Sequence, residues 1–90
     1  MNKKSKFVYI VSITAYVNDS FYGTSYKAFN NRKVACRWVR NEIIKHEKDS
    51  YKLRGVGDKE DEWMLSNMNG SNRVIYQGCY KAILGKSDIK

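Results

Sequence analysis

The stretch FNNRKVACRWVRNEIIKHEK, residues 29–48, decides the fold because it carries the clearest helix-start signal in the chain. Asn30 can accept hydrogen bonds from the backbone N–H groups that a helix start leaves unpaired. Phe29 before it and Val34 after it have the spacing of a hydrophobic staple, which fixes the direction in which the chain enters a helix. We therefore expect a helix that begins at about Asn30 and ends at about Lys48.

This helix has an apolar face and a cationic face when its residues are projected at about 100° each. The apolar residues predicted to face inward are Val34, Ala35, Trp38, Val39 and Ile43. The cations predicted to gather on the opposite side, around Ile44, are Lys33, Arg37, Arg40 and Lys48. These four cations are candidates for partner binding, although the solvated side of any packed helix carries the same residue types.

Glu42 and His46 fall within the apolar arc one turn apart, and we expect each to satisfy the other through an i, i+4 contact. A histidine beside a glutamate is also the minimum needed for proton transfer. No Ser or Cys nucleophile and no metal-binding pattern is placed near them, so a structural pair is the preferred interpretation. We predict that the protein is not an enzyme and binds no cofactor or metal.

Two strands are predicted before the helix. KFVYIVSITAYVND, residues 6–19, alternates apolar and polar residues, and SFYGTSYKAF, residues 20–29, would return antiparallel to it. A tight turn at Asn18-Asp19 joins them. This register places the following residues opposite the apolar face of the first strand: Tyr22, Thr24, Tyr26 and Ala28. A slip of one residue would turn all of them to the other face.

The chain after the helix is predicted to contain a loop and a second hairpin. Residues 49–62 mix charges with glycine and indicate a surface loop, with a short extended piece at 51–54. Strands at 63–68 and from Arg73 to about Leu84 are joined by a turn at Asn69-Gly70. The alternative for the first of these strands is a short helix from Lys59 to Asn67, capped by Asp58.

The sequence thus predicts a single α+β domain over residues 1–90, with flexible ends at 1–6 and 86–90. Its order is β-β-α-β-β, an antiparallel sheet of about four strands with the helix packed on one face. Cys36 and Cys79 are expected to be reduced, mostly buried thiols. A disulfide between them, or a zinc site that also uses His46, is the less favoured alternative.

Charge and hydropathy limit which partners and which cellular location can be expected. Seventeen Lys and Arg against nine Asp and Glu leave a formal charge of +8, which favours acidic or phosphate-rich partners. No apolar run is long enough to span a membrane, and the stretch from Phe7 to Val17 lacks the cleavage site of a signal peptide. We therefore expect a cytoplasmic protein without membrane contact.

One helix covers only one face of such a sheet, and the other face is predicted to be apolar. Its residues would be Val8, Ile10, Tyr16, Ile75, Cys79 and Ile83. An exposed apolar face indicates a partner, which is either a second copy or a different protein. The alternative is cover by the loop and the N-terminal arm. For a docking role, Tyr16, Tyr22 and Tyr26 would supply contact area.

Direct nucleic-acid binding is the alternative function. Lys33, Arg37 and Arg40, together with tyrosines that stack on unpaired bases, are chemically sufficient for it. Trp38 is predicted to point inward, however, so the aromatic and basic residues do not interleave on one surface. The RNA-recognition sheet fold also requires a second helix and a Gly-and-aromatic motif that are not found here.

The segments FVYIVSITAYVND (7–19) and KAFNNRKVACRWV (27–39) resemble small β-β-α-β proteins that bacteriophages and mobile elements encode. The lack of proline and the abundance of Lys, Asn, Ile, Ser and Tyr are similar to products of AT-rich phage genomes. The resemblance implies an accessory protein that blocks or redirects a host machine, and anti-CRISPR proteins are among the candidates. The expected function is therefore a non-enzymatic inhibitor or adaptor that docks on a host protein or ribonucleoprotein complex in the host cytoplasm.

Overall fold

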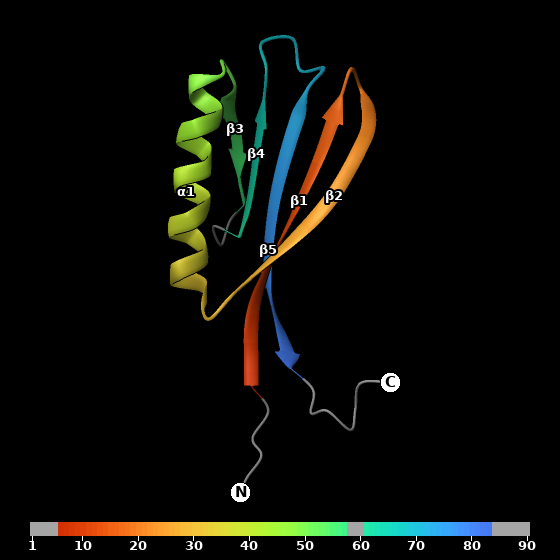
Figure 1. The fold of residues 1–90 in the computed structure, drawn as a ribbon. Coiled ribbons are helices and arrows are strands. Elements are labelled where there is room, and N and C mark those ends of the chain that lie inside the picture. The colour runs from red at the N-terminus through yellow and green to blue at the C-terminus, as the bar shows by residue number, and fades with distance from the viewer. Residues whose placement is uncertain (1–5, 58–60, 84–90) are drawn as a thin grey trace, which may run out of the picture.

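The computed structural model describes residues 6–57 and 61–83. Within these residues the chain forms one α-helix and a five-stranded antiparallel sheet (Figure 1). The predicted α+β class is confirmed, with five strands where about four were expected. The elements are β1 (Lys6–Val17), β2 (Ser20–Phe29), α1 (Arg32–Lys48), β3 (Lys52–Val56), β4 (Glu62–Ser66) and β5 (Arg73–Ile83). The predicted flexible ends lie outside the described residues, apart from Lys6.

The first and last strands are neighbours at the centre of the sheet, whose order is β2-β1-β5-β4-β3. β1 and β5 pair without interruption from Lys6 opposite Ile83 to Tyr16 opposite Arg73. Figure 1 shows β5 between β1 and β4, with β2 and β3 forming the two edges. The predicted alternation of β5 follows from this register, because Val74, Tyr76 and Tyr80 share one face.

The additional strand is β3, which lies within the segment that the sequence predicted to be mainly a surface loop. It pairs with β4, and an irregularity between Leu53 and Gly55 leaves Arg54 unpaired in the ladder. Arg54 instead donates hydrogen bonds from Nε to Ser66 Oγ at 2.9 Å and from Nη2 to the Asn67 carbonyl at 3.1 Å. The short extended piece predicted at 51–54 overlaps β3, but a short, cationic, bulged edge strand has no clear apolar alternation, which is why the sequence pattern did not place it in the sheet.

β4 is a strand, so the alternative helix from Lys59 to Asn67 is wrong over the described part of that segment. Trp63 and Leu65 are buried while Met64 between them is exposed, which is the alternation of a strand that covers the core on one side. The turn that follows contains Gly70 at φ +80°, in the left-handed region that glycine adopts without strain.

The register of the first hairpin differs from the predicted one because β2 contains a β-bulge. Asn18 and Asp19 have φ of 52° and 65°, as a two-residue hairpin turn requires. Tyr22 is then an extra residue, because Phe21 lies opposite Tyr16 and Gly23 lies opposite Ala15. The prediction was therefore wrong beyond the bulge. Thr24, Tyr26 and Ala28 pair with Thr14, Ser12 and Ile10, on the face away from the core.

The helix begins one residue later than predicted, since the N-cap is Asn31, whose Oδ1 accepts a hydrogen bond from Val34 N at 2.9 Å. This shift removes the predicted staple. Val34 is 39% exposed instead of facing inward, and Phe29 packs on Trp38 with ring centroids 5.4 Å apart. The end of the helix at Lys48 agrees with the prediction.

The core is a cluster of side chains from the helix and from three strands. Ala35, Val39 and Ile43 of α1 join residues of the sheet in it, and those sheet residues are Tyr9, Val11, Trp63, Leu65, Val74 and Tyr76. Gly78 of β5 makes room for the ring of Tyr9, because a Cβ at this position would overlap Cε2 and Oη and lie 2.6 Å from Cζ. The core thus lies on the Tyr9 side of the sheet.

Candidate binding surfaces

The open face is the side of the sheet that points away from this core. We define it by its larger apolar and aromatic members, which are Ile10, Tyr16, Phe21, Tyr26, Met64 and Ile75. They share a face because the register sets Tyr16 beside Phe21 and Arg73, and sets Thr14 beside Thr24 and Ile75. A 3.3 Å contact between the hydroxyls of Thr14 and Thr24 supports this register.

No helix of residues 6–57 and 61–83 lies over the open face, since the one helix of this part of the chain buries Ala35, Val39 and Ile43 on the other side. Residues 52–56 of the predicted loop, the alternative cover, form the edge strand β3 instead. Tyr26 is 71% exposed and Phe21 is 63% exposed. The N-terminal arm lies outside the described residues.

Of the three predicted contact tyrosines, Tyr16 and Tyr26 belong to the open face, and Tyr22 is the bulge residue and 77% exposed. The guanidinium of Arg73 lies 4.8 Å from the centre of the Tyr16 ring. Arg73 also pairs with Asp19 at 3.0 Å and donates to the Gly70 carbonyl at 2.7 Å. The Tyr16 ring is thereby partly occupied by Arg73, whereas Tyr26 is 71% exposed and available for contact.

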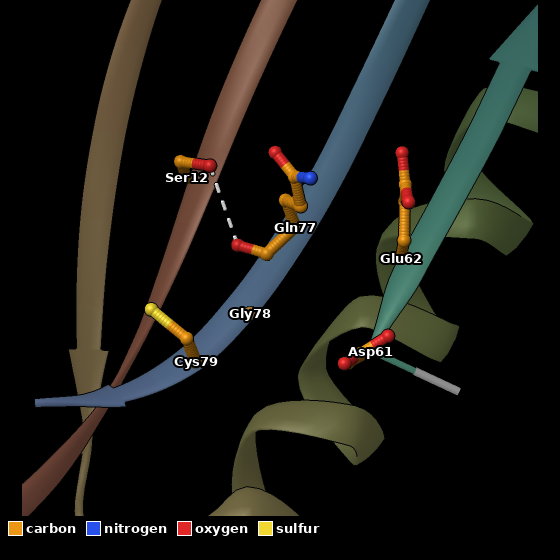
Figure 2. Close-up of a pocket in the computed structure, with 6 residues that line it drawn as sticks. All are labelled: Ser12, Asp61, Glu62, Gln77, Gly78 and Cys79. Carbon is orange, nitrogen blue, oxygen red and sulfur yellow. Dashed lines mark hydrogen bonds between the residues drawn. The ribbon is translucent and has the colours of Figure 1, made fainter. Parts of the chain in front are cut away.

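A shallow hollow of about 290 Å³ lies on the same side of the sheet and is lined by Ser12, Asp61, Glu62, Gln77, Gly78 and Cys79 (Figure 2). Ser12 donates to the Gln77 carbonyl at 3.3 Å, and Gly78 N donates to the Asp61 carbonyl at 2.7 Å. The carboxylates of Asp61 and Glu62 suit a cationic group of a partner. Sequence reasoning missed them, because residues of β5 and of a predicted loop meet here only through the register.

Cys79 is exposed on the wall of this hollow, so the prediction that both thiols are mostly buried is wrong for it. Its position in β5, opposite Ile10, places its side chain on the open face. Cys36 is half-buried on α1, and no disulfide joins the two. Among the described residues, no group of His, Cys, Asp and Glu side chains is arranged to hold a metal ion.

The basic stripe comprises Lys33, Arg37, Arg40 and Lys48, all of which are exposed on α1. At about 1.5 Å per residue the stripe is roughly 22 Å long. It lies on the side of α1 that faces away from the sheet, because Ala35, Val39 and Ile43 face the core. The basic stripe and the open face are therefore on opposite sides of the molecule.

The predicted Glu42–His46 contact does not form. His46 Nε2 lies 2.8 Å from Tyr76 Oη, and Glu42 pairs with Lys45 at 3.0 Å. Burial, and to a smaller extent the charge of Glu42, raise the pKa of Tyr76 to about 12. A tyrosine with this pKa is a poor proton donor at neutral pH, so the geometry favours a structural role for the pair.

Comparison with protein-family models, with curated proteins and with solved structures finds no match to this chain. The resemblance to small phage-encoded proteins therefore remains a prediction. Within the described part of the chain, no helix combines the length and the apolar character that crossing a membrane requires.

Proposed function

We propose that this protein is a non-enzymatic binding protein that docks on another protein through the open face of its sheet. The observation that carries the proposal is the exposure of aromatic and apolar side chains on this face, above all Tyr26, Phe21 and Met64. Burial of such a surface in a complex contributes about 25 cal/mol per Å² of apolar area. Tyrosine is also among the residues that most often anchor protein interfaces.

The partner proposed is a protein with a mixed apolar and acidic surface. A formal charge of +8 attracts such a surface over a distance, and the exposed cations of the basic stripe contribute to this attraction. The carboxylates of Asp61 and Glu62 line the hollow on the open face and provide a complementary site for a Lys or Arg of the partner. Long-range steering and local contact thus come from different parts of the molecule.

A protein partner is favoured over nucleic acid by the separation of the two surfaces. Proteins that bind single strands combine stacking aromatics and backbone-tracking cations in one groove. Here the aromatic residues of the open face and the cations of α1 lie on opposite sides, and Trp38 is half-buried against Phe29 and Tyr76. In the biological role that the resemblance implies, docking would block or redirect a host machine, as anti-CRISPR proteins do.

The test uses two variants that each place one new cation on one of the two surfaces. Tyr26→Arg alters the open face, and Ile44→Arg alters the basic stripe at a side chain that is 52% exposed. Both leave the net charge positive. Each protein is immobilised and incubated with host lysate, with and without nuclease treatment. Captured proteins are identified by mass spectrometry, and their affinity is then measured with purified components.

The proposal expects a protein that binds the wild type and Ile44→Arg and is lost with Tyr26→Arg. Equal binding by Tyr26→Arg, or loss with Ile44→Arg alone, would exclude docking through the open face. If nuclease treatment removes all binding, the partner is nucleic acid.

Sequence-tolerant RNA or DNA binding is the second candidate, and the row of exposed cations on α1 favours it. It predicts oligonucleotide affinity that falls steeply with salt, with a logarithmic slope of about −0.9 per phosphate neutralised on duplex DNA. Filter binding at two salt concentrations measures this slope. Lys33→Glu with Arg37→Glu would then abolish binding, while Tyr26→Arg would preserve it.

A further inference from the structure

The edge strand β2 is unlike the other edge of the sheet. β2 is ten residues long and carries Lys27 as its one charged residue. β3 is five residues long, carries Lys52 and Arg54, and is interrupted by an irregularity in its pairing. Sheet edges are ordinarily protected against further pairing by short length, charge, proline or bulges. The β3 edge has three of these features, whereas beyond its bulge at Tyr22 the β2 edge has almost none.

We infer that β2 pairs antiparallel with β2 of a second copy of this chain, which joins the two sheets into one continuous sheet. A strand that pairs with its own copy around a two-fold axis meets an identical surface, as a symmetric dimer requires. Among residues 6–57 and 61–83, β2 has its backbone paired on one side only, with β1, since it is the first strand in the sheet order. Eight of its ten side chains are exposed, so no described residue buries this strand.

Charge selects the register of this pairing. Residues that lie opposite each other in an antiparallel pair must share a face. In a symmetric pair this requires that one residue lies directly opposite its own copy, with the two-fold axis between them. An axis at Tyr26 would set the two copies of Lys27 about 7 Å apart along the strands, within the Debye length of about 8 Å in physiological salt. An axis at Ser25 sets them about 14 Å apart and is therefore favoured.

Side-chain pairing agrees with the axis at Ser25. In this register Thr24 lies opposite Tyr26 of the second copy, and the pair occurs twice because of the symmetry. Pairs of aromatic and β-branched residues across strands each contribute about 0.2–1 kcal/mol relative to alanine. Lys27 lies opposite Gly23, where no side chain obstructs it.

The size of the interface sets the expected affinity. Tyr22 and Tyr26 are 77% and 71% exposed, and an aromatic side chain buries about 150–250 Å² when fully covered. Edge pairing covers only the flanks of these tyrosines, so the buried area stays below the roughly 1,200–2,000 Å² that stable complexes bury. We therefore expect a reversible dimer with a dissociation constant in the micromolar range, which dilution converts to monomer.

Sedimentation velocity over a wide concentration range tests the inference with variants at Ser25, which is exposed on the side of β2 away from the open face. Ser25→Lys brings two ammonium groups to the two-fold axis and is expected to leave the protein monomeric at all concentrations. Ser25→Thr, the matched control, keeps a small strand-forming residue and is expected to dimerise like the wild type. A wild type that stays monomeric at millimolar concentration, or a dimer that persists in Ser25→Lys, would overturn the proposal.

Cross-linking tests the register independently. In a Cys79→Ser background, which removes the exposed native thiol, Ser25→Cys places two Cβ atoms about 4.5–5.5 Å apart, so that a movement of about 1 Å reaches the roughly 3.5–4.5 Å that a disulfide spans and the bond forms on oxidation. Gly23→Cys keeps Lys27, places the two Cβ atoms about 14 Å apart along the strands in this register, and is the control. Equal or faster cross-linking of Gly23→Cys would refute the axis at Ser25. Because Ser25 is not on the open face, loss of the dimer with retained partner binding separates this inference from the proposed function.

Discussion

Gly78 offers the sharpest test of how the core is packed, since its replacement by alanine is expected to destabilise the protein although glycine is a poor strand residue. A Cβ at this position would overlap Cε2 and Oη of Tyr9, a rigid ring that is only 2% exposed and packs in the core. Overpacking of this kind costs about 1–3 kcal/mol. At Gly23, also in a strand, no atom lies within 4 Å of the added Cβ.

Gly23→Ala is therefore the matched control and is expected to stabilise the protein by about 0.5–1 kcal/mol, through the smaller loss of backbone entropy on folding. A loss of about 2 kcal/mol in Gly78→Ala corresponds to a decrease in melting temperature of roughly 8–16 °C for a domain of this size. Urea unfolding followed by circular dichroism measures both variants, and the midpoint shifts are expected to have opposite signs.

A double-mutant cycle identifies the cause. In a Tyr9→Ala background the obstruction is absent, so Gly78→Ala is expected to lose its cost, with a coupling energy of about 1–3 kcal/mol. The reasoning fails if Gly78→Ala is as stable as Gly23→Ala, or if its cost is the same with and without the Tyr9 ring.

Three further predictions concern the helix cap, the pKa of Tyr76 and the basic stripe. Asn31→Ala removes the N-cap and should cost about 1 kcal/mol in thermal unfolding, whereas Asn30→Ala should change stability by only a few tenths. The folded state raises the pKa of Tyr76 to about 12 from the ordinary value of 10.0. The free energy of unfolding should therefore fall as pH rises from about 10 to 12, by at most about 1.4 kcal/mol per pH unit. Urea titrations of Tyr76→Phe should lack this pH-dependent decrease. Lys33→Glu with Arg37→Glu should slow association with an acidic protein partner about tenfold at low salt and leave dissociation unchanged in stopped-flow traces, while Lys33→Arg with Arg37→Lys should not.

The parts of the fold that could be predicted are those with a strong apolar pattern. β5 alternates clearly, and its predicted faces agree with the register, in which Tyr76 and Tyr80 share one side and Ile75 and Cys79 the other. The helix end at Lys48 could be predicted because the separation of cationic and apolar faces continues up to this residue. Patterns of this kind are set by burial, which is visible in one sequence.

The register of β2 could not be predicted, because nearly all of its side chains are exposed and no buried face opposes a slip. The bulge at Tyr22 therefore leaves no trace in the pattern of apolar residues, although it moves Tyr26 from the predicted face to the open face. The hollow around Asp61 and Glu62 depends on that same register, which brings distant strands together. The predicted contact between Glu42 and His46 was wrong for a similar reason. The partner of His46 is Tyr76 of a distant strand instead of Glu42 one turn away.

The pairing of β1 with β5 has a consequence for biosynthesis. Lys6 lies opposite Ile83, so the central ladder of the sheet joins residues from nearly opposite ends of the described chain. Closing such a long loop costs conformational entropy, which is offset only when the β1–β5 ladder has formed. Non-local topologies of this kind therefore fold slowly. During translation the aromatic β1–β2 hairpin is therefore exposed until β5 has been synthesised. A chain truncated before β5 lacks the central partner of β1 and is expected to be degraded by proteases.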